Sequence, residues 1–197
     1  MRVLVTGGAG YIGSHTAKAL AKAGHEPIVL DNLSFGHRWA VKWGPLLEWD
    51  LADQELLPQF LVKEHVDAVL HFAAWLLVGE SVREPRKYFW NNVVSTLRLL
   101  DAMLEAGVKI IVFSSSCAVY GNPQRTPMAE DHPKEPVNPY GETKLAMERA
   151  LQWYGNAYGL KWVALRYFNA AGADAGGELG ESHNPEIHLI PKRLLYR

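Results

Sequence analysis

Short apolar runs alternate along the chain with longer segments of helical periodicity. Six runs rich in Val, Ile and Leu predict buried strands, at 3–6, 28–30, 46–49, 68–72, 110–113 and 162–165. Apolar residues recur at three- and four-residue spacing in four longer segments, which predicts helices at 12–23, 53–65, 85–105 and 140–158. Proline and polar residues fill 123–139, and the pattern loosens beyond Asn169, so we expect loops in both places.

Strands that alternate with helices need crossover connections, and these produce a parallel sheet covered on both faces. We therefore predict an α/β fold with a doubly wound parallel sheet, a Rossmann fold. Ligands bind such sheets outside the carboxyl ends of the strands. Five predicted strands lead into candidate site residues: the glycines from Gly7, Asp31, Asp50, the segment 72–74 and the serines 114–116.

A glycine-rich turn follows the first predicted strand and opens the first predicted helix. Gly7, Gly10 and Gly13 have the spacing of a dinucleotide fingerprint. The first glycine permits the tight turn, the second lets the backbone approach a pyrophosphate, and the third lets the helix pack on the sheet. The phosphates would lie at the positive end of the helix.

Asp31 ends the second predicted strand, where a carboxylate can accept hydrogen bonds from both ribose hydroxyls of NAD. The same negative charge would repel the additional phosphate of NADP. We therefore predict NAD as the cofactor.

Tyr140 and Lys144 lie four residues apart on one face of a predicted helix. A nearby ammonium group favours the phenolate, so this pair could supply a base near neutral pH. Ser116 closes the serine triplet, and its hydroxyl could donate to a substrate oxygen and relay a proton towards the tyrosine.

Composition and charge exclude several classes of partner. Hydrophobic residues make up 48% and charged residues 21% of the 197 residues, which is typical of globular proteins. The 20 Lys and Arg residues balance 21 Asp and Glu residues without a basic block, so we expect neither nucleic acid nor a membrane surface as partner. The sequence shows neither a signal peptide nor a membrane-spanning run, which favours a cytoplasmic location.

The sequence also gives little support for a metal site. One cysteine cannot form an intramolecular disulfide or a cysteine cluster. The densest group of metal-ligating residues is Glu181, His183, Glu186 and His188. This segment contains Pro185, and no second cluster completes a coordination sphere, so we expect no metal.

Taken together, these motifs resemble the extended short-chain dehydrogenase/reductase family, and within it most closely the members that epimerise UDP-hexoses at C4. The resemblance rests on the glycine turn, Asp31, Ser114–Ser116, Tyr140–Lys144 and Arg166–Asn169, and on the stretches 31–34, 78–82, 91–93 and 113–121. It extends from residue 1 to about residue 190.

The resemblance implies a role for each matching position. Ser116, Tyr140 and Lys144 would be catalytic, and Ser116, Tyr140 and Asn169 would contact a UDP-sugar. The cofactor would be held by the three glycines and by Tyr11, Ile12, Asp31, Asn32, Leu33, Ser34, Phe35, Gly36, Asp50, Leu51, Phe72, Ala73, Ala74, Trp75, Leu76, Asn91, Tyr140, Lys144 and Phe168.

The implied reaction is a transient oxidation of a UDP-hexose such as UDP-glucose or UDP-galactose. Tyr140 would take the proton of the 4-hydroxyl while C4 passes a hydride to NAD, and the hydride would return to the other face of the 4-keto sugar. Cys117 and Ala118 follow Ser116 where related dehydratases carry a pair of acids, which disfavours a dehydratase. Leu76 also replaces a lysine that some family members have near the nicotinamide.

The resemblance also predicts the organisation of the chain, because the members of this family are considerably longer than 197 residues. We expect an NAD-binding Rossmann domain over 1–170 and the truncated start of a substrate-binding region over 171–197, so that this chain alone would bind NAD but turn over little substrate. We further expect a homodimer through the helices at 85–105 and 140–158. Two alternatives stay open, an NAD-binding module without turnover and another NDP-sugar epimerase, reductase or dehydratase.

Overall fold

A six-stranded parallel sheet forms the centre of the protein. The computed structural model describes residues 1–52, 55–183, 186 and 188–195. All strand pairs are parallel, in the order β3-β2-β1-β4-β5-β6. The strands are β1 (Arg2–Thr6), β2 (Glu26–Leu30), β3 (Leu46–Leu47), β4 (Ala68–His71), β5 (Ile110–Ser116) and β6 (Lys161–Tyr167). This order confirms the predicted Rossmann-type sheet.

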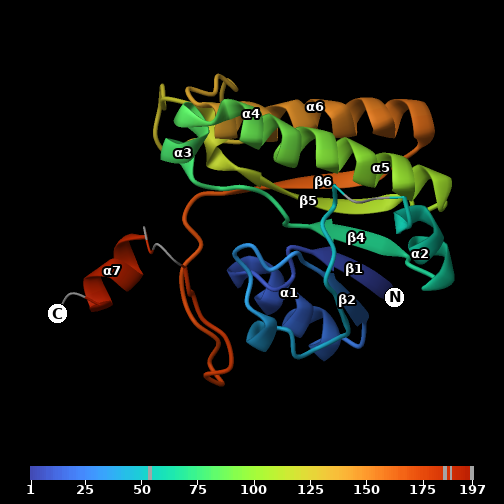
Figure 1. Cartoon of the computed structure of the whole chain (residues 1–197). Helices are drawn as coiled ribbons and strands as arrows, with labels where there is room; N and C mark the ends of the chain where they lie inside the picture. Colours follow the sequence, from blue (N-terminus) through green and yellow to red (C-terminus); the bar gives the residue numbers. More distant parts are fainter. Residues whose placement is uncertain (53–54, 184–185, 187, 196–197) are drawn as a thin grey trace.

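Helices cover the two faces of the sheet, as crossover connections require (Figure 1). One face carries α1 (Tyr11–Lys22), and the other carries α5 (Ser95–Glu105) and α6 (Pro139–Tyr158), with α2 (Leu57–Lys63) packed against α5. The largest apolar cluster joins α5, α6 and α2 to the sheet through fully buried side chains that include Leu57, Leu99, Met103, Ile111, Phe113, Met147 and Leu151.

The segment between β4 and α5 is more broken than the predicted single helix at 85–105. It consists of α3 (Val78–Arg83), α4 (Pro85–Tyr88) and a wide π-type turn, η2 (Phe89–Val94), which leads into α5. Pro85 begins α4, where its missing N–H group costs nothing. Wide turns of this kind are frequent at functional sites, and Asn91 of the predicted cofactor site lies in this one.

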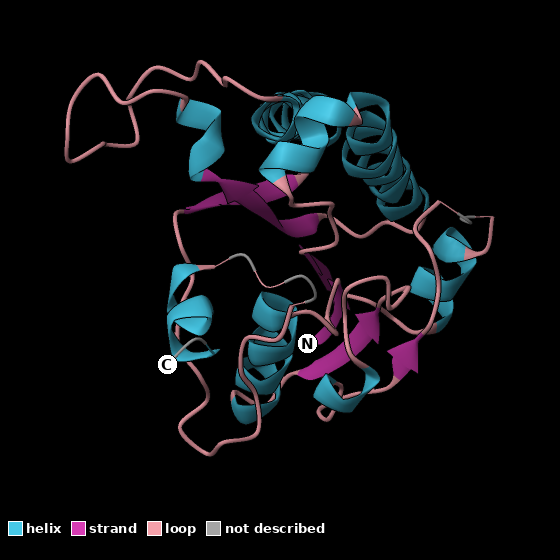
Figure 2. Ribbon diagram, turned by 60° about the vertical axis from the view of Figure 1, so that its left-hand side comes forward, coloured by secondary structure: helices cyan, strands magenta, loops and turns pink. Residues whose placement is uncertain are grey.

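Four short elements have no counterpart in the prediction: α3, which ends before residue 85, and η1 (Arg38–Ala40), η3 (Cys117–Tyr120) and α7 (Leu189–Leu195). The segment after β6 extends along α1, and α7 lies on the α1 half of the molecule, away from α5 and α6 (Figures 1 and 2). The predicted helix at 53–65 is confirmed from Leu57 to Lys63, while Asp53 and Gln54 lie outside the described residues. Within the described part of the chain, no helix is long and apolar enough to cross a membrane.

Candidate functional site

The turn between β1 and α1 can be made only with glycine at two positions. Gly7 has a φ of +68°, and a Cβ there would lie 2.6 Å from the backbone nitrogen of Ala73. A Cβ on Gly13 would lie 2.2 Å from the carbonyl oxygen of Gly7. The turn therefore requires both glycines for its close backbone approaches.

The helix that follows this turn has an open N-terminus. Gly10 caps α1 without a side-chain hydrogen bond, and the first turn of the helix carries no acidic residue. Backbone N–H groups at such an end attract an anion, and the helix dipole adds to the effect. The site therefore fits the pyrophosphate of a dinucleotide.

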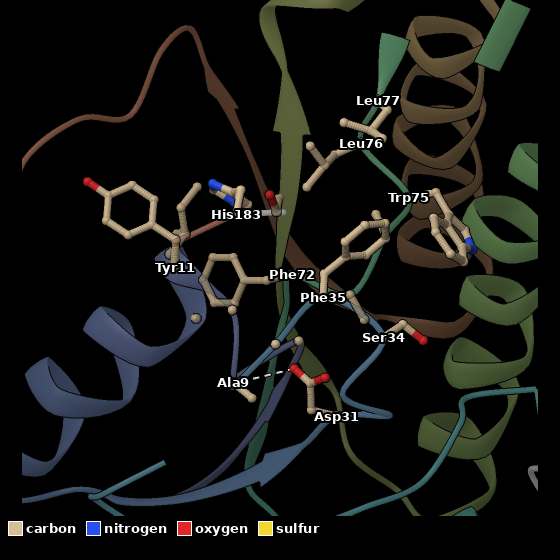
Figure 3. A pocket seen from close by; sticks show the side chains of 18 of the residues that line it. Ala9, Tyr11, Asp31, Ser34, Phe35, Phe72, Trp75, Leu76, Leu77 and His183 are labelled. Carbon is tan, nitrogen blue, oxygen red and sulfur yellow. Dashed lines mark hydrogen bonds between the residues drawn. The ribbon is translucent and has the colours of Figure 1, made fainter. Parts of the chain in front are cut away.

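Asp31 is fixed beside this turn by two backbone hydrogen bonds. Its Oδ2 accepts from the Ala9 nitrogen at 3.0 Å, and its Oδ1 accepts from the Leu33 nitrogen at 2.8 Å (Figure 3). Burial raises the pKa of Asp31, and the two N–H donors oppose that rise. The carboxylate is thus held in one orientation at the end of β2, next to the glycine turn.

An aromatic pair and a second acidic residue lie near Asp31. Phe35 and Trp75 meet edge to face with their ring centroids 4.7 Å apart (Figure 3). The side-chain nitrogen of Asn32 donates to Oδ2 of Asp50 at 2.8 Å, which links the segments after β2 and β3. Apolar ring faces beside hydrogen-bonding groups are typical of small-molecule sites.

Two local hydrogen bonds place Tyr140 in the first turn of α6. Asn138 caps the helix, with its Oδ1 accepting from the Gly141 nitrogen at 2.9 Å. The Tyr140 nitrogen donates to Oγ of Ser81 at 3.2 Å, which ties α6 to α3. Lys144 lies one turn further along the helix and is 3% exposed.

The Lys144 side chain reaches the end of β5 rather than the tyrosine hydroxyl. Its Nζ donates to the carbonyl oxygen of Ser114 at 2.7 Å and lies 5.8 Å from the centre of the Tyr140 ring. Burial lowers the pKa of Lys144 to about 7. Since no carboxylate pairs with it in the described part of the chain, its ammonium form is less stable than that of a surface lysine.

Tyr140 lies in a mostly buried environment that disfavours its phenolate. Burial raises the pKa of Tyr140, and a hydrogen bond with Ser116 partly offsets the rise. The sequence argument expected Lys144 to lower the phenol pKa, but here the net shift is upward. That effect of Lys144 therefore stays a prediction for the cofactor-bound state, in which an oxidised nicotinamide would add positive charge.

Ser116 ends β5 and turns the chain into η3. Its Oγ accepts from the Ala118 nitrogen at 3.2 Å, so the hydroxyl proton is free to point towards Tyr140 or a substrate oxygen. The next two residues, Cys117 and Ala118, line the cavity and carry no acid.

These elements enclose one cavity of about 740 Å³, which is within the usual range for ligand sites. Figure 3 shows its wall from Tyr11 and His183 past Phe72 to Trp75 and Leu76. With one exception, every residue predicted for the site lines this cavity. The exception is Leu33, which the sequence placed in the cofactor site: its φ of +58° belongs to a tight turn in which its N–H group is directed at Asp31.

Several residues in or behind the wall of the cavity were not predicted. Asn92 is buried and holds the backbone of Trp75 on both sides, accepting from its nitrogen at 2.8 Å and donating to its oxygen at 2.9 Å. Two adjacent asparagines inside an apolar helical pattern were the available signal. Glu181, Ser182, His183 and His188 also line the cavity, although the sequence indicated only a loop there.

Hydrogen bonds and ion pairs hold the segment after β6 against α1 and the loop before β3. The Tyr11 hydroxyl donates to the Gly172 oxygen at 2.6 Å, and Nζ of Lys18 lies 2.7 Å from Asp174 and 2.5 Å from Glu178. His37 Nε2 lies 3.1 Å from the Ser182 oxygen. These contacts bring residues 180–183 to the edge of the cavity.

Comparisons with known proteins identify the family of this chain. The sequence model of the NAD dependent epimerase/dehydratase family matches residues 3–192. The chain belongs to this family. A UDP-glucose 4-epimerase of Rhizobium meliloti is 54% identical over 189 residues, covering 96% of this chain and 58% of the relative. One of Halalkalibacterium halodurans is 54% identical over 191 residues, covering 97% of this chain and 57% of the relative. The chain thus spans less than two thirds of the length of these relatives.

Solved structures give the same result. The UDP-glucose 4-epimerase of Brucella ovis in complex with NAD superposes with a TM-score of 0.95 at 56% identity, covering 97% of this chain and 59% of that one. The enzyme of Bifidobacterium longum in complex with NAD⁺ and UDP superposes with a TM-score of 0.88 at 39% identity, covering 93% of this chain and 58% of that one. The family resemblance inferred from the motifs is confirmed.

Proposed function

We propose that this chain carries the cofactor site and the catalytic residues for NAD-dependent epimerisation at C4 of a UDP-hexose such as UDP-glucose or UDP-galactose. One observation supports this most strongly: Ser116, Tyr140 and Lys144 line the same cavity as the glycine turn and Asp31. The names of the relatives, UDP-glucose 4-epimerase, give the substrate class.

We propose that two consecutive regions of the chain have different roles. Residues 1–170 form the NAD-binding domain, and residues 171–197 begin the region that binds the sugar nucleotide. The segment after residue 170 contacts Lys18 and His37, and these contacts bring it to the rim of the cavity. In the described part of the chain it adds no strand to the sheet, which supports this division.

NAD fits the residues at the cofactor end. The open N-terminus of α1 would receive the pyrophosphate, and Asp31 would accept from the adenosine ribose hydroxyls. Phe35 and Trp75 would supply apolar contact nearby, and Lys144 would donate to the ribose of the nicotinamide. Phe168 and Asn169 line the cavity beyond β6, where the sugar nucleotide would lie.

The catalytic step uses the two hydroxyls at the end of β5 and the start of α6. Tyr140, as phenolate, takes the proton of the sugar 4-hydroxyl, and Ser116 hydrogen-bonds the same substrate oxygen. When bound, NAD accepts the hydride from C4 and returns it to the opposite face of the 4-keto sugar. Tyr140 then gives the proton back, so that the reaction is balanced without a net change in redox state.

The two alternatives are separated by particular observations. A dehydratase needs an acid next to the strand-end hydroxyl, and Cys117 and Ala118 offer none. A binding module without turnover would hold NAD yet leave the sugar unoxidised.

The decisive test adds UDP-glucose or UDP-galactose to NAD-loaded protein. The absorbance of reduced nicotinamide and the conversion between the two sugars are both followed. In a chain extended to the full length of the relatives we expect both signals, and we expect Tyr140→Phe to lower turnover by about a hundredfold or more, as for loss of a positioned base, with NAD binding retained. The 197-residue chain alone should bind NAD and give little of either signal. Tyr158→Phe changes an exposed tyrosine of the same helix and serves as the matched control. NAD binding without either signal in the extended chain would establish the binding module instead.

A further inference from the structure

Four side chains that ligate metals converge at the rim of the cavity. One ligand atom each from Glu181, His183, Glu186 and His188 lies within 4.8 Å of the other three. Three of these side chains are largely buried, with 9% of Glu181, 16% of His183 and 12% of Glu186 exposed, while His188 is 36% exposed. A single stretch of eight residues thus supplies all four atoms, which removes the sequence argument that a second cluster would be needed.

The two histidine rings present the same nitrogen to the carboxylates. Nδ1 of His183 lies 3.3 Å from Oε1 of Glu181, and Nδ1 of His188 lies 2.5 Å from that oxygen. Nevertheless, both Nδ1 atoms are buried without an aligned hydrogen bond. Buried polar atoms that approach an acceptor but fail to bond to it need another partner, and a bound ion is one such partner.

The spacing of the ligand atoms agrees with tetrahedral coordination. Metal–ligand distances of about 2.0–2.1 Å place neighbouring ligands of a tetrahedron about 3.3 Å apart. Three of the four separations between imidazole and carboxylate atoms are near this value, at 3.3 Å from Glu181 to His183, 3.3 Å from Glu186 to His188 and 3.8 Å from Glu186 to His183. The fourth, from Glu181 to His188, is shorter at 2.5 Å, so these two side chains would have to move apart around a bound ion. Two imidazole and two carboxylate ligands are a donor set for divalent transition metals such as zinc.

We propose that Glu181, His183, Glu186 and His188 bind one divalent transition-metal ion of the zinc type, as a structural site. The segment leading to it is already held on α1 and η1 through Lys18 and His37. A metal ion would fix the remaining part of this segment beside Tyr11, at the phosphate-binding end of the cavity (Figure 3). The site closes one wall of the cavity and takes no part in the proton transfer.

The test measures metal binding directly on protein freed of any purification tag. Apo-protein is titrated with Co²⁺, whose visible absorption reports tetrahedral coordination, and then with Zn²⁺ in competition with a chromophoric chelator. We expect one ion per chain and displacement of Co²⁺ by Zn²⁺. His183→Gln, His188→Gln and Glu181→Gln should each weaken Zn²⁺ binding by at least about tenfold, the smallest loss expected even for partners outside the metal shell.

The matched control is His25→Gln, which removes a histidine that lies near the N-terminal amine. It should bind Zn²⁺ as the unaltered protein does. Circular dichroism and NAD binding verify that each variant folds, and Glu181→Gln conserves the size of the side chain if a histidine variant does not fold. Absence of stoichiometric Zn²⁺ binding, or a folded Glu181→Gln protein that binds as tightly as the unaltered one, would overturn the proposal.

Discussion

We predict that the charge of Asp31 determines which dinucleotide the site accepts. Its carboxylate is held by Ala9 and Leu33 and lines the cavity. Asp31→Asn conserves the shape but removes the charge that would repel a ribose phosphate. We expect NADP to bind at least about tenfold more tightly to the variant than to the unaltered protein, which corresponds to 1.4 kcal/mol, while NAD binds more weakly.

Titration of both cofactors by calorimetry checks this expectation. Asp67→Asn is a suitable control, because Asp67 accepts from the Arg2 nitrogen at the start of β1, at the opposite ends of the strands from the cavity. If NADP gains nothing from Asp31→Asn, the carboxylate has another role.

His71 couples the stability of the protein to pH. It is 2% exposed between Thr6 and Thr96, with Nδ1 2.6 Å from one hydroxyl and Nε2 2.9 Å from the other. Thr96 already donates its hydroxyl proton to the Asn92 oxygen, so Nε2 of His71 is the donor to the Thr96 hydroxyl. Burial lowers the pKa of His71 to about 3, with a smaller contribution from Lys144.

The sign of the effect follows from linkage. The unfolded chain takes up a proton near pH 6.5 while the folded protein does not, so stability is fully present above pH 6.5 and is lost as the pH falls towards 3. Between pH 7.5 and pH 5 this residue should cost about 2 kcal/mol of unfolding free energy. In urea denaturation, His71→Gln should lose that part of the pH dependence, whereas His65→Asn at an exposed site should retain it. An equal pH dependence in all three proteins would contradict the buried neutral ring.

At the scale of elements, a buried ion pair fastens α6 to the sheet. Arg166 of β6 donates from Nε and Nη2 to the two oxygens of Glu148 of α6, at 2.8 and 2.7 Å. Ser115 of β5 donates to Glu148 at 2.6 Å, and Arg166 also donates to the Tyr120 hydroxyl at 2.8 Å. Burial alone would raise the pKa of Glu148, but the donors from Arg166 and Ser115 outweigh it and hold the pKa below its usual value.

Removing one partner of this ion pair should lower the unfolding free energy more than removing both partners does. Arg166→Leu leaves the Glu148 charge buried, which should reduce the unfolding free energy by about 3–5 kcal/mol. The double variant Arg166→Leu/Glu148→Leu should recover most of that loss, because no unpaired charge remains. Arg125→Leu breaks an exposed pair with Asp131 and should cost no more than about 1 kcal/mol. Urea denaturation of the four proteins measures these differences, and a single variant as stable as the double one would contradict the argument.

The sequence predicted the elements whose periodicity is set by burial. All six strands and the positions of α1, α5 and α6 follow from apolar spacing. Most of these elements bury one face or both, but β3 is only partly buried and β6 leaves Trp162, Val163 and Leu165 exposed. The prediction was wrong where the local backbone geometry determines how an element is interrupted or where it ends. The wide turn η2 interrupts the expected helix at 85–105, and β3 ends at Leu47 instead of residue 49. Neither a π-type turn nor the end of an edge strand has a signature in hydrophobic periodicity.

For the whole molecule, the sequence predicted the site residues that follow the strand ends. It did not predict a residue such as Asn92, whose side chain hydrogen-bonds the backbone of another segment. Gly7, Asp31, Ser116 and Tyr140 line one cavity because the carboxyl ends of parallel strands meet at one edge. The binding of Trp75 by Asn92 depends on how a loop folds back on a helix, which spacing does not reveal. Likewise, the metal-ligating group at 181–188 depends on a segment without periodicity.

The surface of the helical layer bears on assembly. The predicted homodimer rested on an apolar excess of the helices at 85–105 and 140–158. On α5 that excess is absent from the described outward positions, which carry Arg98, Asp101 and Glu105. The exposed aromatic area of η2 and α6 lies instead on four residues, with Phe89 43%, Trp90 55%, Trp153 70% and Tyr158 54% exposed. Exposed aromatic groups of this size are typical of interfaces.

A homodimer through this layer therefore stays a prediction, now centred on the aromatic residues. In a symmetric dimer each substitution acts twice, because the same patch is present on both copies. Trp153→Glu and Trp90→Glu should each shift the molar mass measured by light scattering at micromolar concentration towards that of the monomer, with secondary structure unchanged. Val62→Glu introduces the same charge at an exposed apolar position of α2, 56% exposed, and should leave the mass unaltered. A monomeric unaltered protein, or a dimer insensitive to both tryptophan substitutions, would show that α6 and η2 do not form the interface.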